Sequence, residues 1–170
     1  MTRRERSEPT EDAGHEAGTP VLAAGLGNVL FDVWLVSRAA TALIDAAVKP
    51  AGLDADEFAI YSVLASAPGL TPTELARWMA APPTTVSSYI KRFERRGHVR
   101  RAAHPEDRRS YRVHLTAAGA AAHQAAGERF LPRLQEVTRL LGRGGPDTHR
   151  RLRVLHEALA TLNESGERQI

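Results

Sequence analysis

Basic side chains gather in one part of this sequence, between residues 71 and 115. That segment carries ten Lys or Arg side chains against four Asp or Glu, a net charge of +6, whereas the 170-residue chain as a whole is only +3. The rest of the chain is therefore slightly acidic. A local excess of cations on such a chain is the pattern expected of a site for a polyanion, with a merely solvated charged surface as the alternative.

Within this segment, residues 83–96 have the spacing of a helix with an apolar face. Val86, Ile90 and Phe93 are four and three residues apart, so they share the side that faces the core. The remaining surface carries hydroxyls and cations that suit base edges and phosphates, namely Thr84, Thr85, Ser87, Ser88, Lys91, Arg92 and Arg95. Glu94 is the one acid there, whereas an ordinary solvated helix would more often mix Glu with Lys.

After Gly97 the apolar pattern changes from helical to alternating. Residues 99–104 and 110–115 read as two strands, joined by a polar turn at 105–109. Arg108 and Arg109 lie at the tip, and a narrow basic tip can enter a minor groove, where arginine is attracted by the concentrated negative potential. We expect Asp107 to orient an arginine, because a free carboxylate at the tip would repel phosphate.

Two earlier helices should hold these groups in place. Asp54 with Glu57, and Thr71 with Glu74, have the spacing of capping boxes, so they predict helices that begin at about residues 54 and 71. Short helices separated by a tight break and followed by a basic hairpin make a winged helix-turn-helix. In this motif the first helix supports the second, whose exposed face enters the major groove.

Long helical regions flank this motif on both sides. From Leu22 the apolar residues follow helical spacing until the chain reaches Pro50. A second long helix should run from Ala117 to about Leu141, with a kink at Pro132, and a loop at 142–146 should lead to a last helix with a narrow leucine stripe. Such apolar faces need cover, and a partner subunit is a natural candidate. The expected dimerisation residues are Leu22, Leu26, Leu152, Leu155, Leu159 and Leu162.

The wing segment His104–Arg109, followed by Leu115–Thr116–x–x–Gly119, resembles the MarR family of regulators. The stretch Thr84–Gly97 is similar to that family's recognition helix, and the resemblance extends from about residue 22 to residue 162. It implies an α+β, mostly helical fold, a winged helix-turn-helix with a helical dimerisation lobe. It also implies an obligate homodimer on a pseudo-palindromic operator in double-stranded DNA, with Arg109 as the wing arginine and Asp107 as the wing acid.

Two features depart from the family pattern. Pro82 and Pro83 stand where such proteins often have a Ser or Thr cap, so the recognition helix could begin one turn differently. His98 replaces the usual aliphatic residue after the glycine.

The organisation expected from these features has three parts. They are a disordered tail at 1–20, a helical dimerisation lobe formed by 21–50 and 116–165, and the winged helix-turn-helix at 53–115. The function implied is a sequence-specific transcription regulator, a repressor that a small-molecule effector relieves. A ligand pocket between the lobes would be lined by Trp34, Arg38, Phe58 and Tyr61, although core packing explains these residues equally well.

Several function classes are excluded or unsupported. The chain has no cysteine, which excludes a disulfide framework, a thiolate metal site and a thiol sensor. No stretch approaches the roughly 20 apolar residues of a membrane span, and the first 20 residues lack an apolar signal core, so we expect a cytoplasmic protein without membrane contact. No phosphate loop, nucleophile elbow or dinucleotide motif is present, so neither an enzyme nor a cofactor is expected.

Two alternatives remain open. A winged helix can serve as a protein-interaction module, which acidic or apolar groups on the recognition face would indicate. A metal-responsive regulator could use some of the seven histidines. No two of them lie one helical turn apart as in common zinc sites, so no metal site is expected.

Overall fold

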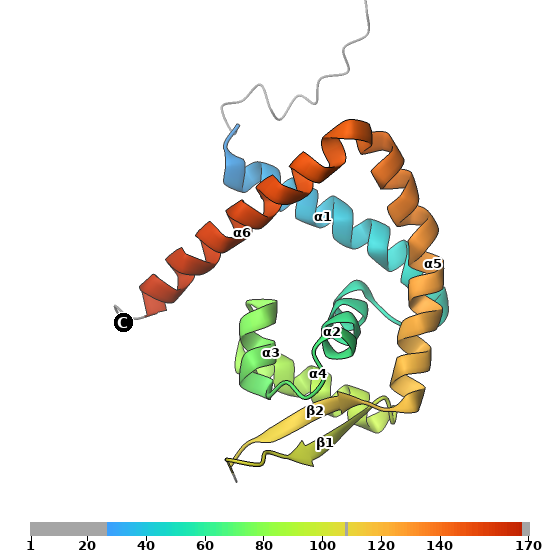
Figure 1. Cartoon of the computed structure of the whole chain (residues 1–170), viewed down its shortest axis with the longest axis vertical. Helices are drawn as coiled ribbons and strands as arrows, with labels where there is room; N and C mark the ends of the chain where they lie inside the picture. The colour runs from blue at the N-terminus through green and yellow to red at the C-terminus, as the bar shows by residue number, and fades with distance from the viewer. Residues whose placement is uncertain (1–26, 108, 168–170) are drawn as a thin grey trace, which may run out of the picture. The chain divides into compact units, whose positions relative to one another are not determined.

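A computed structural model of the chain describes residues 27–107 and 109–167. The described chain is mostly helical with one small antiparallel sheet (Figure 1), which confirms the predicted α+β, mostly helical class. Its contacts divide it into two units, one ending at Arg38 and one beginning at Ala39, inside the first helix, α1 (Val29–Val48). The predicted tail at 1–20 lies outside the described residues, and the predicted lobes stay a prediction. No helix in the described part is long and apolar enough to cross a membrane.

The first unit contains the beginning of α1. The Asn28 Oδ1 atom accepts hydrogen bonds from the backbone N–H groups of Leu30 and Phe31, at 3.1 and 3.0 Å, which caps the helix. The Phe31 ring stacks on Trp34 with their centroids 5.8 Å apart. Within the single chain, this part of α1 exposes large apolar side chains, namely Val29, Leu30, Trp34, Leu35 and Val36.

The second unit begins with two capped helices. A short 3₁₀ turn, η2 (Lys49–Ala51), leads to α2 (Ala55–Ser66), and α3 (Pro72–Met79) follows. Both predicted capping boxes are confirmed. The Asp54 Oδ1 atom accepts from the Glu57 N–H at 2.7 Å, and Glu57 Oε2 accepts from the Asp54 N–H at 3.2 Å. In the second box, Thr71 Oγ1 accepts from the Glu74 N–H at 3.2 Å, and Glu74 Oε2 accepts from the Thr71 N–H at 2.7 Å.

The helix predicted at 83–96 is α4 (Pro83–Arg95). Pro82 occupies its cap position without a side-chain hydrogen bond, and the turn before it holds Ala80 in the left-handed region with φ 47°. The core of the second unit is built around its apolar face, because Val86, Ile90 and Phe93 are fully buried there. Side chains from neighbouring elements complete this core, among them Ile60, Tyr61, Leu64, Leu75 and Val113.

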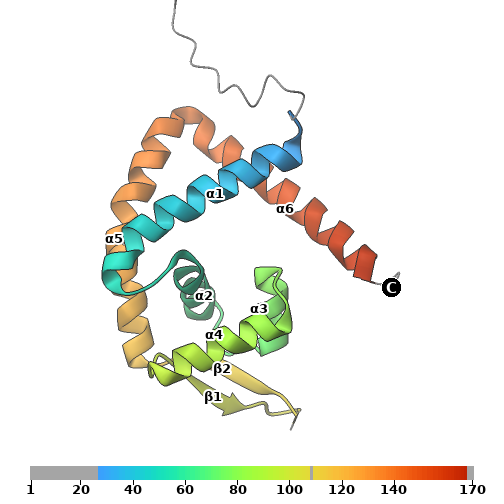
Figure 2. The same ribbon diagram turned by 180° about the vertical axis from the view of Figure 1, so that it is seen from behind.

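The predicted hairpin is confirmed as β1 (Val99–Ala103) and β2 (Tyr111–Leu115), which pair antiparallel. Val99 lies opposite Leu115, and Ala103 lies opposite Tyr111. An isolated bridge from Leu70 to Val113 adds the chain before α3 to the edge of β2. Figure 2 shows α4 running alongside the hairpin, in agreement with the contacts between α4 and β1.

The chain then forms two long helices, α5 (Ala117–Leu141) and α6 (Gly145–Glu167). Pro132 lies inside α5 as predicted, and α5 packs on α2. The loop predicted at 142–146 is wrong, because a 3₁₀ turn, η3 (Gly142–Gly144), leads directly into α6. Pro146 does not prevent this, since proline is compatible with the first turn of a helix, where its missing N–H has no partner to lose.

Candidate nucleic-acid interface

The surface of α4 divides into three faces. One is the buried apolar face described above. A second face consists of Tyr89, Arg92 and Arg96, all of which contact residues of α2 or its cap. The third, which we call the outward stripe, has helical steps of four, three and four and consists of Thr84, Ser88, Lys91 and Arg95, all exposed. The helix therefore presents hydroxyls and cations together on a side free of the core.

The outward stripe has the chemistry predicted for it. Its Ser88 hydroxyl donates to the Thr84 carbonyl oxygen at 3.0 Å, and Ser88, Lys91 and Arg95 line a shallow hollow together with Glu94. Among the described residues, none of the ion pairs involves Lys91 or Arg95. Both cations are therefore available to an anionic partner. Of the other predicted contact residues on α4, Thr85 is exposed and Ser87 is half-buried.

Glu94 is the one acid of α4, and an arginine of the hairpin forms an ion pair with it. Its Oε2 atom accepts from an Arg101 NH2 group of β1 at 2.6 Å, and this hydrogen bond raises the pKa of the Arg101 guanidinium. The same guanidinium lies over the Tyr111 ring, 4.3 Å from its centroid. The pair thus removes a carboxylate's repulsion from the stripe and joins α4 to the wing.

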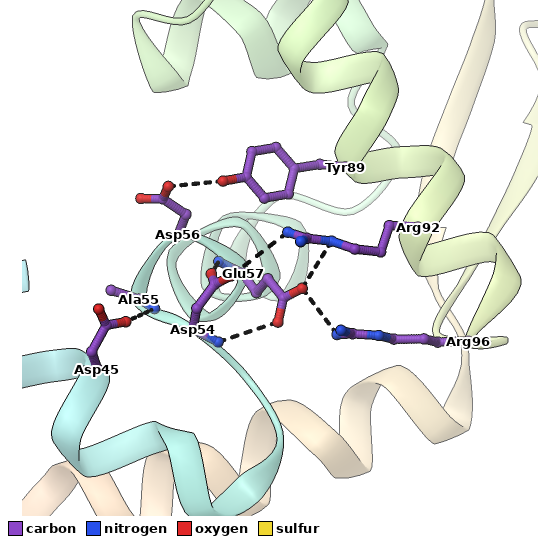
Figure 3. A network of polar contacts seen from close by, with 8 residues as sticks. All are labelled: Asp45, Asp54, Ala55, Asp56, Glu57, Tyr89, Arg92 and Arg96. Atoms are coloured by element: carbon purple, nitrogen blue, oxygen red, sulfur yellow. Dashed lines mark hydrogen bonds and ion pairs between the residues drawn. The ribbon is translucent and has the colours of Figure 1, made fainter.

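Arg92, which the sequence predicts to contact DNA, has ion pairs within the chain. Its guanidinium turns toward α2, where Nε lies 3.0 Å from Glu57 Oε1 and NH2 lies 3.7 Å from Asp54 Oδ2 (Figure 3). The contact with Glu57 is an ion pair rather than a well-aligned hydrogen bond. The physical reason is that the Glu57 side chain is only 2% exposed, and a buried carboxylate requires a countercharge.

In the described part of the wing turn, side chains accept backbone N–H groups. The Asp107 Oδ1 atom accepts from the Arg109 N–H at 2.9 Å, which is the local turn that an Asp favours. His104 Nδ1 accepts from the N–H groups of Glu106 and Asp107 at 3.2 and 3.1 Å. Asp107 thus contacts the backbone of Arg109, whose side chain is exposed. Arg108 lies outside the described residues.

A further arginine, Arg112, lies near the turn of the hairpin, opposite Ala102. The Arg112 NH1 group donates to the Gly69 carbonyl oxygen at 3.2 Å, and its NH2 group lies 3.4 Å from His104 Nε2. These contacts tie the wing to the segment between α2 and α3. Sequence alternation placed Arg112 on the side of β2 away from the core but gave no signal for this partner, which is 43 residues away.

The four residues predicted to line a ligand pocket fall into the two units. Tyr61 is fully buried, its hydroxyl lies 2.9 Å from His98 Nδ1, and burial raises its pKa to about 12. Phe58 packs against the rings of His123 and Phe130, each with its centroid 5.4 Å away. In the first unit, Trp34 and Arg38 are exposed. Tyr61 and Phe58 therefore have packing roles within their own unit.

Three histidines have structural partners. His98 contacts Tyr61 and His104 holds the wing, while His123 Nε2 lies 2.9 Å from Ser62 Oγ, whose hydroxyl donates to the Phe58 carbonyl oxygen at 2.8 Å. Within residues 27–107 and 109–167, no group of three or more potential ligand side chains is arranged to hold a metal ion.

The predicted dimerisation residues of α6 lie partly or fully in solvent in the single chain. Leu152 is 46% exposed and Leu162 is 68% exposed, while Leu155 and Leu159 are half-buried. Leu22 and Leu26 lie outside the described residues. The described part of the molecule thus has apolar surface on α6 that its own fold leaves uncovered.

The sequence is similar to those of known transcription regulators. Residues 51–110 match the sequence profile of the MarR family. The HTH-type transcriptional repressor Rv2887 of Mycobacterium tuberculosis is 34% identical over 136 residues, which cover 73% of this chain and 96% of that protein.

Solved structures have the same fold. The transcriptional regulator MosR of Mycobacterium tuberculosis, in complex with DNA, superimposes with a TM-score of 0.69 at 28% identity, over 79% of this chain and 98% of that chain. The PcaV transcriptional regulator of Streptomyces coelicolor, in complex with its natural ligand, superimposes with a TM-score of 0.67 at 22% identity. The match covers 81% of this chain and 96% of that chain. The likeness to PcaV shows the fold alone.

Proposed function

This chain belongs to the MarR family, and from that premise we propose that it is a homodimeric repressor released from a pseudo-palindromic operator by a small-molecule effector. As a member of this family, the chain is a DNA-binding transcription regulator and not an enzyme. What the proposal adds is how the residues of this chain perform that task.

The outward stripe is the observation that carries the proposal. Lys91 and Arg95 lie one turn apart beside the exposed hydroxyls of Thr84 and Ser88, and the acid nearest to them, Glu94, is held by Arg101. Short hydroxyls and cations can bond base edges in the major groove and the phosphates that border it. In this proposal α4 is the recognition helix, and its outward stripe faces the base edges in the major groove. A protein-contact module would need acidic or apolar groups there instead.

The wing supplies the second contact in the proposal. Asp107 accepts the backbone N–H of Arg109, and the Arg109 side chain is exposed. A narrow minor groove has an enhanced negative potential that attracts such an arginine. Arg109 is therefore assigned to the minor groove that flanks each major-groove contact.

Dimerisation is supported by apolar surface on both units. The exposed side chains of α1 include Leu30, Trp34 and Val36, and those of α6 include Leu152 and Leu162. Large apolar side chains exposed in this way on a helix are typical of a surface that another protein covers. A two-fold dimer would place two copies of α4 about one duplex turn apart, roughly 34 Å, which a palindromic operator matches.

The proposal includes a small-molecule effector. PcaV, which has this fold, is described in complex with its natural ligand. A ligand that changed the distance between the two recognition helices by a few ångströms would release the operator, because both helices must fit successive major grooves together. Trp34, Arg38, Phe58 and Tyr61 remain our candidates for such a site, although Tyr61 would have to leave its core position to reach a ligand.

Selection of bound sequences from a pool of random duplexes tests the proposal. Selection with the full chain is expected to recover a two-fold symmetric DNA sequence whose half-sites are about 10 base pairs apart. Sedimentation of the complex should give two chains per duplex. Recovery of an asymmetric sequence bound by one chain would refute the dimer, and recovery of no preferred sequence would refute specific recognition.

A further inference from the structure

The Glu57 carboxylate is the most deeply buried charge in the described chain, and it is shared by two arginines of the recognition helix. Its Oε1 atom lies 3.0 Å from Arg92 Nε and 3.0 Å from Arg96 NH1, while Oε2 accepts the Asp54 N–H at 3.2 Å (Figure 3). The side chain is 2% exposed. One carboxylate thus closes the cap of α2 and binds α4 at two points one turn apart.

The surroundings of Arg92 and Arg96 strengthen this attachment. Arg92 also lies over the Tyr89 ring, 4.7 Å from the centroid, and the hydrogen bond with Glu57 raises the pKa of Arg96. The first turn of α2 is fixed in turn, because Asp45 at the end of α1 accepts the Ala55 N–H at 2.6 Å. Glu57 therefore stands on a rigid support when it binds the two guanidinium groups.

This arrangement divides the cations of α4 into two classes. Arg92 and Arg96 face α2 and are paired, whereas Lys91 and Arg95, their immediate neighbours in sequence, belong to the outward stripe and have no ion pair among the described residues. Contacts between cations and phosphates give affinity without sequence information. If all four cations were mobile, the helix would gain sequence-independent affinity.

We propose that Glu57 is a specificity-determining residue, which withholds Arg92 and Arg96 from phosphates and, together with the buried apolar face, holds α4 so that the outward stripe meets base edges. This inference rests on the proposed function, since it concerns how the same helix discriminates among DNA sequences. Glu57 does not touch DNA in this account. It acts through the two arginines, as a positioning residue.

The test compares binding of full-length variants to two duplexes over a series of salt concentrations. One is the duplex recovered by selection from random sequences, and the other is an alternating dI·dC polymer as the sequence-independent probe. Glu57→Gln keeps the size of the side chain and an oxygen for the Asp54 N–H, but it loses the charge that holds the arginines. The ratio of the two affinities is expected to fall at least about tenfold, which corresponds to about 1.4 kcal/mol.

The salt dependence on the dI·dC polymer separates this role from a merely structural one. Each additional neutralised phosphate steepens the slope of log affinity against log salt by about 0.9, so two released arginines should steepen it by up to about 1.8. A loosened fold would instead weaken binding to both duplexes together and leave the slope unchanged or shallower. That result would overturn the proposal.

The matched control is Asp56→Asn, which removes one carboxylate from the same turn of α2. Asp56 accepts the Tyr89 hydroxyl at 2.8 Å and has no ion pair with an arginine among the described residues. Its change in net charge equals that of Glu57→Gln, so it should leave the affinity ratio within about twofold of the parent protein. An equal fall in both variants would assign the effect to net charge and refute the role of Glu57.

A second set of variants tests the same point with Glu57 intact. Arg92→Gln and Arg96→Gln should leave the slope on the dI·dC polymer unchanged, because these arginines are already paired, while Lys91→Gln should reduce it by about 0.9. A reduction by either arginine variant equal to that of Lys91→Gln would contradict the proposal. A parent protein that binds neither duplex would refute the proposed function itself, which distinguishes the two failures.

Discussion

Gly119, in the first turn of α5, lies so close to the backbone of His98 that a Cβ added to it would stand 2.0 Å from the His98 carbonyl oxygen. That oxygen accepts the Thr116 N–H at 2.9 Å, and the Thr116 hydroxyl donates to the Gly97 carbonyl oxygen at 2.6 Å. The motif Leu115–Thr116–x–x–Gly119 thus joins the exit of the recognition helix to the start of the long helix. Only glycine permits this approach.

Gly119→Ala is therefore expected to destabilise the protein. The added methyl group must displace a backbone carbonyl that is already hydrogen-bonded, so the free energy of unfolding should fall by about 2 kcal/mol or more. Urea unfolding followed by circular dichroism measures the change. Gly127→Ala is the control in the same helix, since its Cβ would meet nothing within 4 Å, and it should stabilise the protein slightly. Equal effects of the two substitutions would disprove the close contact.

Arg109→Ala should weaken operator binding roughly tenfold without changing the fold or the dimer. The side chain is exposed at the tip of the wing, and only its backbone N–H is used by Asp107. Fluorescence anisotropy with the selected duplex at physiological salt measures the loss. Arg129→Ala removes an exposed arginine of α5 and should have little effect. If affinity were the same in both variants, the wing arginine would have no part in binding.

Leu152→Glu and Leu159→Glu should separate the dimer, and with it abolish specific DNA binding. Each substitution would bury a carboxylate between subunits if α6 contributes to the proposed interface. Ala160→Glu adds the same charge on another side of α6, at an exposed position, and should leave the dimer intact. Sedimentation velocity gives the answer, and a dimer of unchanged stability in both leucine variants would place the interface elsewhere.

His123 should make the protein less stable in mild acid. Burial lowers its pKa below the usual value of 6.5, so the unfolded chain takes up the proton first as the pH falls. Stability is therefore fully present above about pH 6.5 and is lost as the pH falls toward the pKa of the folded state. His123→Gln keeps an N–H for Ser62 and should reduce the difference between urea midpoints at about pH 7.5 and about pH 5.5.

The control for this pH dependence is His149→Gln, because His149 is exposed on α6. It should keep the full dependence of the parent protein. If removal of His123 left the dependence unchanged, another group would be responsible for it.

Local patterns in the sequence were sufficient to predict the helices of the helix-turn-helix. The capping boxes at Asp54 and Thr71 involve partners only three residues apart, and the apolar spacing of α4 repeats within two turns. Both features specify the local backbone before any tertiary contact exists. The resemblance of the wing segment to the MarR family then predicted how these elements combine into one fold.

The partners of the arginines could not be predicted in the same way. Sequence placed Arg92 among seven polar residues on the surface of α4, and only the packing of α4 on α2 decides that it turns toward Glu57. Arg96 meets Glu57 across 39 residues of chain. The spacing of Glu57 indicated its capping role, but no local pattern indicates that the same carboxylate also binds two guanidinium groups.

Chemical footprinting of the complex with the selected duplex tests the central claim most directly, that α4 enters the major groove and the wing enters the minor groove. Methylation of guanine N7 reports the major groove, and hydroxyl-radical cleavage reports the minor groove. We expect N7 protection in two patches about 10 base pairs apart, with minor-groove protection outside each patch that Arg109→Ala removes. Guanines that stay fully reactive throughout the bound site, or minor-groove protection unaffected by Arg109→Ala, would contradict the account.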